Sequence, residues 1–260
     1  TAPHRPLQAP ISDIDAQLGN YSVGYDVVRE RRFNALKQSG IISAAAVQPA
    51  STAPAWEPLT AEQKARSERT MEVYAAMVAN MDRNIGELIQ ALRDRGDLDN
   101  TIIVFLSDNG ADGLEFDAIA PVFAEWTNSF DNSLENIGHI GSYVSYGRGW
   151  AHAGEAPHTG FKGQLNEGGT RAPLIVALPD RLQSNSEFAG TRYDQLVSVR
   201  DLLPTLLDYA SIDDHGTDFA GRDVHPISGT SIRPLLEGTQ AEIHSDTAIG
   251  SELWNLRSIV

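Results

Sequence analysis

The residues best suited to chemistry follow a short apolar run. Residues 101–106 are apolar and mostly β-branched, and Ser107, Asp108, Asn109 and Gly110 come directly after them. A carboxylate beside an amide carbonyl offers two hard oxygen ligands of the kind that Ca²⁺ and Mg²⁺ take in proteins. Asn-Gly is also a strong turn dipeptide. This stretch alone is therefore equally compatible with a polar turn and with a metal-binding loop.

Two further side chains could act on an anion. His4 lies in a segment with prolines at positions 3, 6 and 10, which restrict the backbone and predict a stiff, extended loop. Lys162 stands among glycines shortly before Glu167, Gly168 and Gly169, where a lysine and backbone N–H groups could contact an oxyanion. The simpler interpretation of both is a solvated surface side chain.

The elements that would position these residues are those of an α/β protein. Residues 101–106 and 174–178 lack polar alternation, which predicts strands buried on both faces. Ligands of open α/β sheets bind beyond the carboxyl ends of strands, which is where Asp108 and Asn109 lie. Helices are predicted over residues 25–37 and 197–210, the second with Ser198 and Asp201 as its capping box. A short helix is predicted after residue 229, and the chain ends in a pair of strands from residue 247 onward.

The clearest helix begins at Thr60, which forms a predicted capping box with Gln63. An apolar stripe then repeats at steps of three and four, and Gly96 is suited to end the helix. The stripe consists of Tyr74, Val78, Met81, Ile85, Leu88 and Leu92. We expect it to pack against a sheet, as the second half of a βαβ crossover.

Composition excludes some classes of protein. The 260 residues are 41% hydrophobic, with no stretch of the roughly 20 apolar residues that a membrane span needs. The formal charge of -15 argues against a nucleic-acid surface and would repel an anionic substrate, so attraction must come from local cations or a metal. The chain contains no cysteine, which leaves the compartment undetermined.

Several short motifs, in order, resemble the C-terminal half of a bacterial type I arylsulfatase, of the formylglycine-dependent kind within the alkaline phosphatase superfamily. Any one of them is weak, but together they cover nearly the whole chain and are specific. They are residues 2–10, 71–78, 98–101, 106–110, 130–134, 146–147, 167–173 and 201–205.

The resemblance implies roles for single residues. Asp108 and Asn109 match two ligands of the active-site Ca²⁺, with Mg²⁺ as an alternative. Lys162 matches a lysine that contacts the sulfate and the leaving oxygen. His4 matches a histidine that hydrogen-bonds the sulfate and protonates the leaving alcohol. Glu167 and its neighbours match structural positions.

The resemblance also implies what lies outside this chain. The family's nucleophile is a formylglycine made from Cys or Ser in a Cys/Ser-x-Pro-x-Arg motif, and this chain has neither a cysteine nor Ser-x-Pro-x-Arg. Because the chain starts without Met and its last residues read as the start of a strand, we expect a fragment that is inactive alone and whose partner is the N-terminal half of the same protein.

The expected fold is a partial α/β/α sandwich with a mixed, mostly parallel central sheet. Residues 1–245 would belong to the large sulfatase domain, and residues 246–260 would begin the smaller antiparallel subdomain. The substrate would be a small sulfate ester, whose leaving group is expected to contact the aromatics of residues 116–150. Two alternatives stay open: a phosphonate or phosphate monoester hydrolase, and a non-catalytic sulfatase-like domain. The sequence does not distinguish a periplasmic from a cytoplasmic protein.

Overall fold

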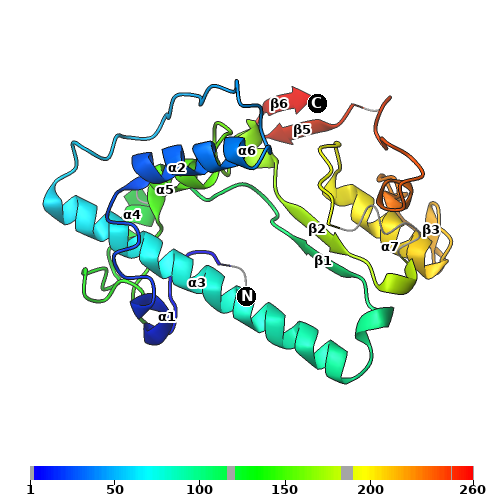
Figure 1. The fold of residues 1–260 in the computed structure, drawn as a ribbon, viewed down its shortest axis with the longest axis horizontal. Coiled ribbons are helices and arrows are strands. Elements are labelled where there is room, and N and C mark those ends of the chain that lie inside the picture. Colours follow the sequence, from blue (N-terminus) through cyan, green and yellow to red (C-terminus); the bar gives the residue numbers. More distant parts are fainter. Residues whose placement is uncertain (1–2, 116–120, 183–189, 247, 260) are drawn as a thin grey trace. The chain divides into compact units, whose positions relative to one another are not determined.

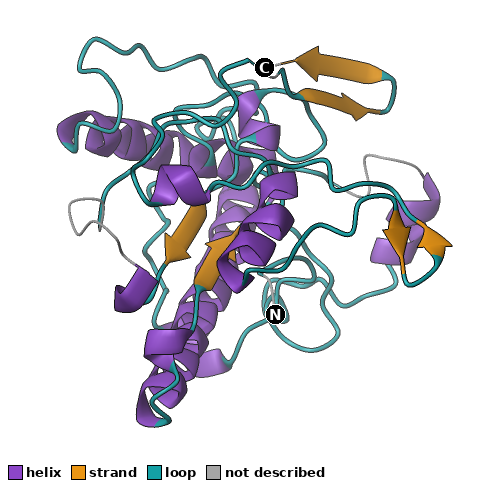
Figure 2. Ribbon diagram, turned by 90° about the vertical axis from the view of Figure 1, so that its right-hand side faces the viewer, coloured by secondary structure: helices purple, strands orange, loops and turns teal. Residues whose placement is uncertain are grey.

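The computed structural model describes residues 3–115, 121–182, 190–246 and 248–259. Its residues divide into two compact units, one of residues 1–95 with 109–174 and the other of residues 96–108 with 175–260. The described strands form three separate two-stranded sheets (Figures 1 and 2). The mostly parallel central sheet expected from the sequence is therefore not formed by the described residues.

The first unit is built along α3 (Ala61–Asp94), the long helix of Figure 1. The predicted capping box is present, with the Gln63 N–H donating to Thr60 Oγ1 and the Thr60 N–H donating to Gln63 Oε1. Gly96 has φ +74°, a left-handed conformation that favours glycine after the last turn. The sequence thus predicted both ends of this helix correctly.

The expected packing of α3 was wrong for its C-terminal half. The helix buries Met71, Val73 and Ala76, whereas Val78 is 36% and Leu88 is 62% exposed. The reason is that the apolar cluster with α1 (Ile11–Asp15) and the segment around residues 137–146 includes Val73 and Ala76 of its first half. In its second half, Asn80 and Arg83 instead donate hydrogen bonds to Asp13 of α1.

Two apolar clusters hold the first unit together. One joins the Pro-rich segment to α3 and the loop that follows α4 (Pro121–Thr127), and it consists of Leu7, Ile14, Val73, Ala76, Ile137 and Val144. The other is aromatic and joins α2 (Tyr25–Gln38) to α5 (Gly147–Gly154). In it, Trp150 meets the rings of Tyr25 and Trp56 edge to face at centroid distances of 5.6 and 6.0 Å. Helices α4 and α5 are not among the elements predicted from the sequence.

The second unit contains the strand that leads to the candidate metal loop. A 3₁₀ turn, η1 (Leu98–Asn100), precedes β1 (Ile103–Leu106), which pairs with β2 (Leu174–Ala177). The expectation of strands buried on both faces was wrong, because Leu106 is 36% and Ile175 is 59% exposed. The described sheet has only these two strands, and they leave part of their apolar side chains uncovered.

The rest of the second unit is made of short elements. A 3₁₀ turn, η3 (Asp180–Leu182), follows β2, and η5 (Val199–Asp201) leads into α7 (Leu202–Ala210) through the predicted capping box of Ser198 and Asp201. The hairpin of β3 (Asp218–Phe219) and β4 (Arg222–Asp223) is followed by α8 (Arg233–Leu236). The last pair, β5 (Gly250–Leu253) and β6 (Leu256–Ile259), is antiparallel with Gly250 opposite Ile259.

The buried Asp201 organises this unit. Its carboxylate accepts hydrogen bonds from the backbone N–H groups of Ser198 and Thr230 and from His244 Nε2 at 2.8 Å. Asp201 is 1% exposed, and these contacts join segments that are distant in the sequence. The Asp-Leu-Leu-Pro-Thr motif of residues 201–205 is therefore a structural element here.

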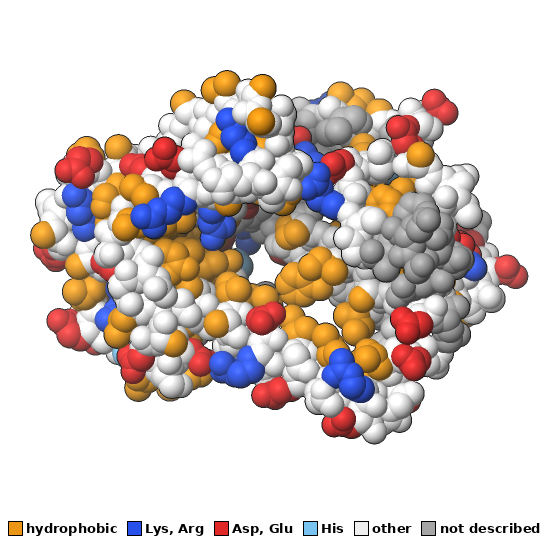
Figure 3. All heavy atoms as spheres, viewed as in Figure 1, with side chains coloured by type: hydrophobic (Ala, Val, Ile, Leu, Met, Phe, Trp, Pro, Cys, Tyr) orange, Lys and Arg blue, Asp and Glu red, His pale blue; other side chains and the backbone are white. Residues whose placement is uncertain are grey.

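The surface of the described residues carries charged side chains of both signs. On the face drawn in Figure 3, Lys and Arg side chains of the described residues lie singly or in small groups among Asp and Glu, without an extended basic area. Among the described residues, none of the helices combines the length and the apolar character required to cross a bilayer.

Candidate active site

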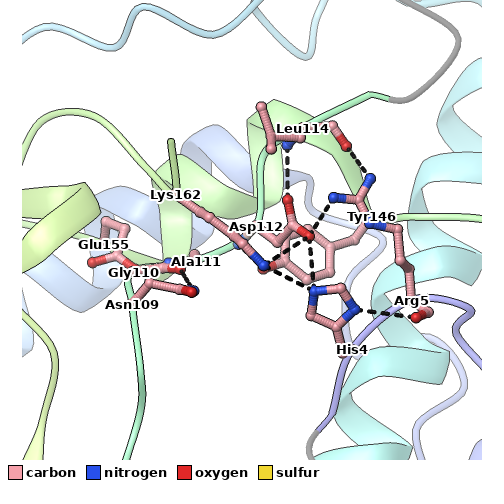
Figure 4. A network of polar contacts seen from close by, with 10 residues as sticks. All are labelled: His4, Arg5, Asn109, Gly110, Ala111, Asp112, Leu114, Tyr146, Glu155 and Lys162. Carbon is pink, nitrogen blue, oxygen red and sulfur yellow. Dashed lines mark hydrogen bonds and ion pairs between the residues drawn. The ribbon is translucent and has the colours of Figure 1, made fainter. Parts of the chain in front are cut away.

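The two side chains singled out for catalysis lie side by side in the first unit. His4 Nε2 is 3.0 Å from Lys162 Nζ, although the residues are 158 positions apart (Figure 4). The His4 side chain is 45% exposed and that of Lys162 is 27% exposed. Both polar groups are therefore accessible to a small ligand while each is partly held by the protein.

A carboxylate that the sequence reasoning missed lies beside them. Asp112 Oδ2 is 3.3 Å from His4 Nε2 and 3.9 Å from Lys162 Nζ. Arg5 Nη2 donates to the same oxygen at 2.7 Å, and Arg5 Nη1 donates to the carbonyl of Leu114 at 3.0 Å. The Arg5 side chain is 6% exposed and that of Asp112 is 14% exposed. One carboxylate oxygen thus faces three basic groups (Figure 4).

Local backbone contacts bring these groups together. The Leu7 N–H donates to the Val144 carbonyl, the Leu7 side chain is 1% exposed, and the Ala9 N–H donates to the Gly138 carbonyl. These contacts fix the segment that carries His4 and Arg5. On the other side, the Lys162 N–H donates to the Ala111 carbonyl at 2.9 Å. The lysine is therefore anchored to the loop that contains Asp112.

A close backbone contact joins the candidate metal loop to the glycine-rich segment. The Gly110 N–H donates to the Gly169 carbonyl at 3.1 Å, and a Cβ at Gly110 would lie 1.7 Å from the Gly168 oxygen. Only glycine fits such an approach. The backbone N–H groups of Gly168 and Gly169 donate to the carbonyls of Thr159 and Asn166. These two amides therefore donate within the protein, and the expected contact of Lys162 and nearby N–H groups with an oxyanion stays a prediction.

Two half-buried side chains, Tyr146 and Glu155, accept hydrogen bonds from the backbone of this loop. The Tyr146 hydroxyl accepts from the Asp112 N–H at 2.8 Å, and burial raises the pKa of this phenol well above its usual range. Glu155 accepts from the Ala111 N–H, and burial raises the pKa of its carboxyl while that hydrogen bond lowers it. The backbone of residues 111 and 112 is thus tied to the residues directly before and after α5.

The two candidate metal ligands differ in exposure. Asp108 is exposed, whereas Asn109 is half-buried. The Asn109 amide donates to the Gly110 carbonyl at 2.8 Å. Among the described residues, no three His, Cys, Asp or Glu side chains come together to hold a metal ion.

These ligands by themselves do not make a calcium site. Ca²⁺ takes about 6–8 oxygen ligands, and the predicted pair supplies one carboxylate and one amide carbonyl. The donor types suit a hard cation, but their number is too small. The described residues therefore do not fit a complete site.

The sequence contained a signal for the residues that were missed. Arg5 stands between His4 and a proline, and Asp112 follows Asp108 within the same polar tip. The signal is that each charged side chain lies close in the sequence to a candidate residue. Their pairing across more than a hundred residues, however, has no signature in the spacing.

Comparison with known proteins identifies the family. The family named Sulfatase matches residues 17–212. The chain is 42% identical over 272 aligned residues to an uncharacterized sulfatase of Schizosaccharomyces pombe, covering 100% of this chain and 47% of that protein. It is 38% identical over 240 residues to an arylsulfatase of Klebsiella aerogenes, covering 90% and 50%. This chain belongs to the sulfatase family, whose domain has the alkaline-phosphatase-like fold.

The relatives are longer than this chain, which spans about half of each of these two. A more distant similarity links it to the crystal structure of Ps i-CgsB in complex with k-i-k-neocarrahexaose, with 21% identity, a TM-score of 0.44, and coverage of 87% of this chain and 41% of that one. The match to the C-terminal half of a sulfatase, inferred from the motifs, is therefore confirmed at the level of the family.

Proposed function

We propose that the full-length protein hydrolyses sulfate esters, releasing an alcohol or phenol and inorganic sulfate, and that this chain supplies the groups that act on the leaving oxygen. The observation that carries the proposal is the 3.0 Å contact between His4 Nε2 and Lys162 Nζ, in a chain of the sulfatase family. An ammonium and an imidazole that meet in this way, both accessible, form a site for an anion that carries a protonatable oxygen.

The proposed chemistry of these residues is simple. In hydrolysis the S–O bond to the alcohol breaks, the leaving oxygen keeps the electron pair, and a water oxygen remains on sulfur. His4, in its imidazolium form, gives the Nε2 proton to the leaving oxygen, a contribution of roughly 10²–10⁴-fold. Lys162 stabilises the negative charge that develops there.

The proposal includes Asp108 and Asn109 as part of a divalent cation site, for Ca²⁺ or Mg²⁺, that is completed by residues outside this chain. When bound, such a cation would stabilise charge on the sulfate oxygens. Because the described residues do not complete its site, no step is assigned to it. The nucleophile, a formylglycine, is likewise proposed to lie outside this chain.

The proposal extends to the architecture. We infer that the β1–β2 pair is part of a mixed, mostly parallel sheet to which the rest of the protein contributes strands. The β5–β6 hairpin within residues 246–260 would begin the smaller C-terminal subdomain, with residues 1–245 in the large one. The exposed apolar side chains of β1 and β2, Leu106 and Ile175, support the first of these inferences.

The test is an assay of the full-length protein on p-nitrophenyl sulfate and p-nitrophenyl phosphate. We expect a clear preference for the sulfate. Lys162→Ala and His4→Ala should each lower kcat/KM by at least about 10²-fold. Thr60→Ala, which removes only the side-chain cap of α3, serves as the control that leaves it unchanged.

Two outcomes would contradict the proposal. A strong preference for the phosphate ester would favour a phosphate or phosphonate monoester hydrolase. A full-length sequence without Cys/Ser-x-Pro-x-Arg, together with no turnover of either ester, would favour a non-catalytic sulfatase-like domain.

A further inference from the structure

Arg5 and Asp112 form an ion pair directly behind the candidate proton donor. The Nη2–Oδ2 distance is 2.7 Å, and the two side chains are 6% and 14% exposed. Charge-assisted hydrogen bonds of this length are the stronger ones in proteins, and partial burial protects them from screening. The second guanidinium contact, to the Leu114 carbonyl at 3.0 Å, fixes the plane of the arginine.

The ion pair also fixes the histidine. His4 and Arg5 are consecutive, so anchoring the Arg5 side chain restrains the backbone of His4. The His4 ring adds its own contact, because Nδ1 lies 3.1 Å from the Arg5 carbonyl oxygen. A carbonyl oxygen only accepts hydrogen bonds. Nδ1 therefore carries a proton, and in the neutral ring Nε2 carries the lone pair.

With Nδ1 protonated, Nε2 can contact a different group in the neutral ring and in the imidazolium. In the neutral ring, the Nε2 lone pair accepts from the Lys162 ammonium at 3.0 Å. In the imidazolium, Nε2 carries a proton and can donate to Asp112 Oδ2 at 3.3 Å. The charged groups that face the ring in the described structure are thus Lys162 and Asp112, with Arg5 behind the carboxylate (Figure 4).

We propose that Asp112, held by Arg5, is a positioning residue that orients His4: it accepts the Nε2 hydrogen bond of the imidazolium before the ester binds, and the leaving oxygen then takes over that hydrogen bond. The inference rests on the proposed function, since it assigns to Asp112 a role toward the proton donor of that reaction. The carboxylate faces His4, Arg5 and Lys162, so the proposed role acts through the histidine. Its backbone supports the arrangement, because the Asp112 N–H donates to Tyr146 and Oδ1 accepts from the Leu114 N–H.

The inference makes a distinctive kinetic prediction for Asp112→Asn in the full-length protein. The amide keeps the shape of the carboxylate and loses its charge. We expect kcat/KM to fall by about 10–100-fold, a part of the factor that general acid catalysis contributes. The high-pH limb of the pH–rate profile should move to lower pH, because the variant removes the negative charge that faces Nε2 at 3.3 Å.

The choice of substrate sharpens the test. A poor leaving group needs the proton more than a good one does, so the loss caused by Asp112→Asn should be larger for phenyl sulfate than for p-nitrophenyl sulfate. A role limited to the fold would lower both rates equally. Asp112→Glu, which keeps the charge, should recover part of the activity and of the pH profile.

The matched control is Asp13→Asn. Asp13 pairs with Arg83 at 2.8 Å in the same unit, and its side chain is 12% exposed, close to the values for Asp112. It lies on α1, and its partners are Asn80 and Arg83 of α3. The control should leave the pH profile and the leaving-group dependence unchanged.

A measurement that does not depend on turnover distinguishes this inference from the proposed function. In ¹⁵N NMR spectra of the full-length wild-type protein, the neutral His4 ring should carry its proton on Nδ1. If the protein turns over no sulfate ester, the proposed function fails, while this tautomer still tests the geometry. A neutral ring protonated on Nε2, or an Asp112→Asn enzyme with an unchanged pH profile and equal losses on both esters, would overturn the inference. If that variant does not fold, the tautomer and Asp112→Glu decide.

Discussion

At the scale of single residues, Gly110 controls how closely the candidate metal loop approaches the glycine-rich segment. In Gly110→Ala, the new Cβ would meet the Gly168 carbonyl oxygen at 1.7 Å, and a backbone atom cannot swing aside. We expect the free energy of unfolding to fall by about 1–3 kcal/mol or more. Sulfatase activity should fall with it, because Asn109 is the adjacent residue. Chemical denaturation and the sulfate ester assay measure the two effects.

Gly86 offers the control for this substitution. It is a helical glycine of α3, and nothing lies within 4 Å of a Cβ placed there. Gly86→Ala should stabilise the protein by up to about 1 kcal/mol, because alanine restricts the unfolded chain and favours helix. Equal effects of the two substitutions would contradict the close approach at Gly110.

His152 makes stability depend on pH. The residue is 1% exposed, and its Nε2 is 2.9 Å from Thr52 Oγ1. Burial lowers the pKa of His152 below 6.5, and the charges of Arg29 and Arg148 lower it further. The unfolded chain therefore takes up the proton first, so the free energy of unfolding should decrease as pH falls through 6.5.

The measurement is the melting temperature of the full-length protein between about pH 8 and pH 5. His152→Gln keeps a polar side chain that does not titrate, and its melting temperature should depend less on pH in this range. The same pH dependence in the wild type and the variant would show that another group is responsible.

At the scale of elements, α3 buries its apolar side chains mainly in its first half. Val73 is fully buried between α1 and the segment around residue 137, whereas Leu88 is 62% exposed. Val73→Ala should cost about 2 kcal/mol of stability through lost burial and a small cavity. Leu88→Ala should cost less than about 0.5 kcal/mol. Denaturant titrations of both variants compare the two, and a similar cost would mean that Leu88 is covered in the full-length protein.

At the scale of the whole molecule, this chain spans about half of its relatives and leaves apolar side chains uncovered. In the second unit, Ile175, Val199, Leu203 and Leu206 are 59%, 68%, 53% and 44% exposed. Exposed apolar strands and helices favour association. We infer that residues outside this chain cover them.

The isolated chain is therefore expected to self-associate and to be inactive. Its two candidate ligands should bind Ca²⁺ more weakly than about 1 μM, because they supply too few oxygens. Calorimetry and light scattering on the isolated chain measure these properties. Tight Ca²⁺ binding by a monomer with one cooperative melting transition would contradict the expectation.

The sequence by itself determined the local elements and the family. Thr60 and Gly96 marked the ends of α3 because caps act over a few residues, and Ser198 and Asp201 marked the start of α7 in the same way. The ordered motifs from residue 2 to residue 205 identified a sulfatase. It also singled out His4 and Lys162, whose side chains the structure brings together.

Only the tertiary structure decided which residues surround that pair and which apolar faces are covered. Asp112 reaches His4 and Arg5 across more than a hundred residues, and a stripe such as Val78 to Leu88 reads the same whether or not a partner covers it. The physical reason is that caps and turns depend on neighbouring residues, whereas burial and ion pairing depend on segments that the chain brings together in space.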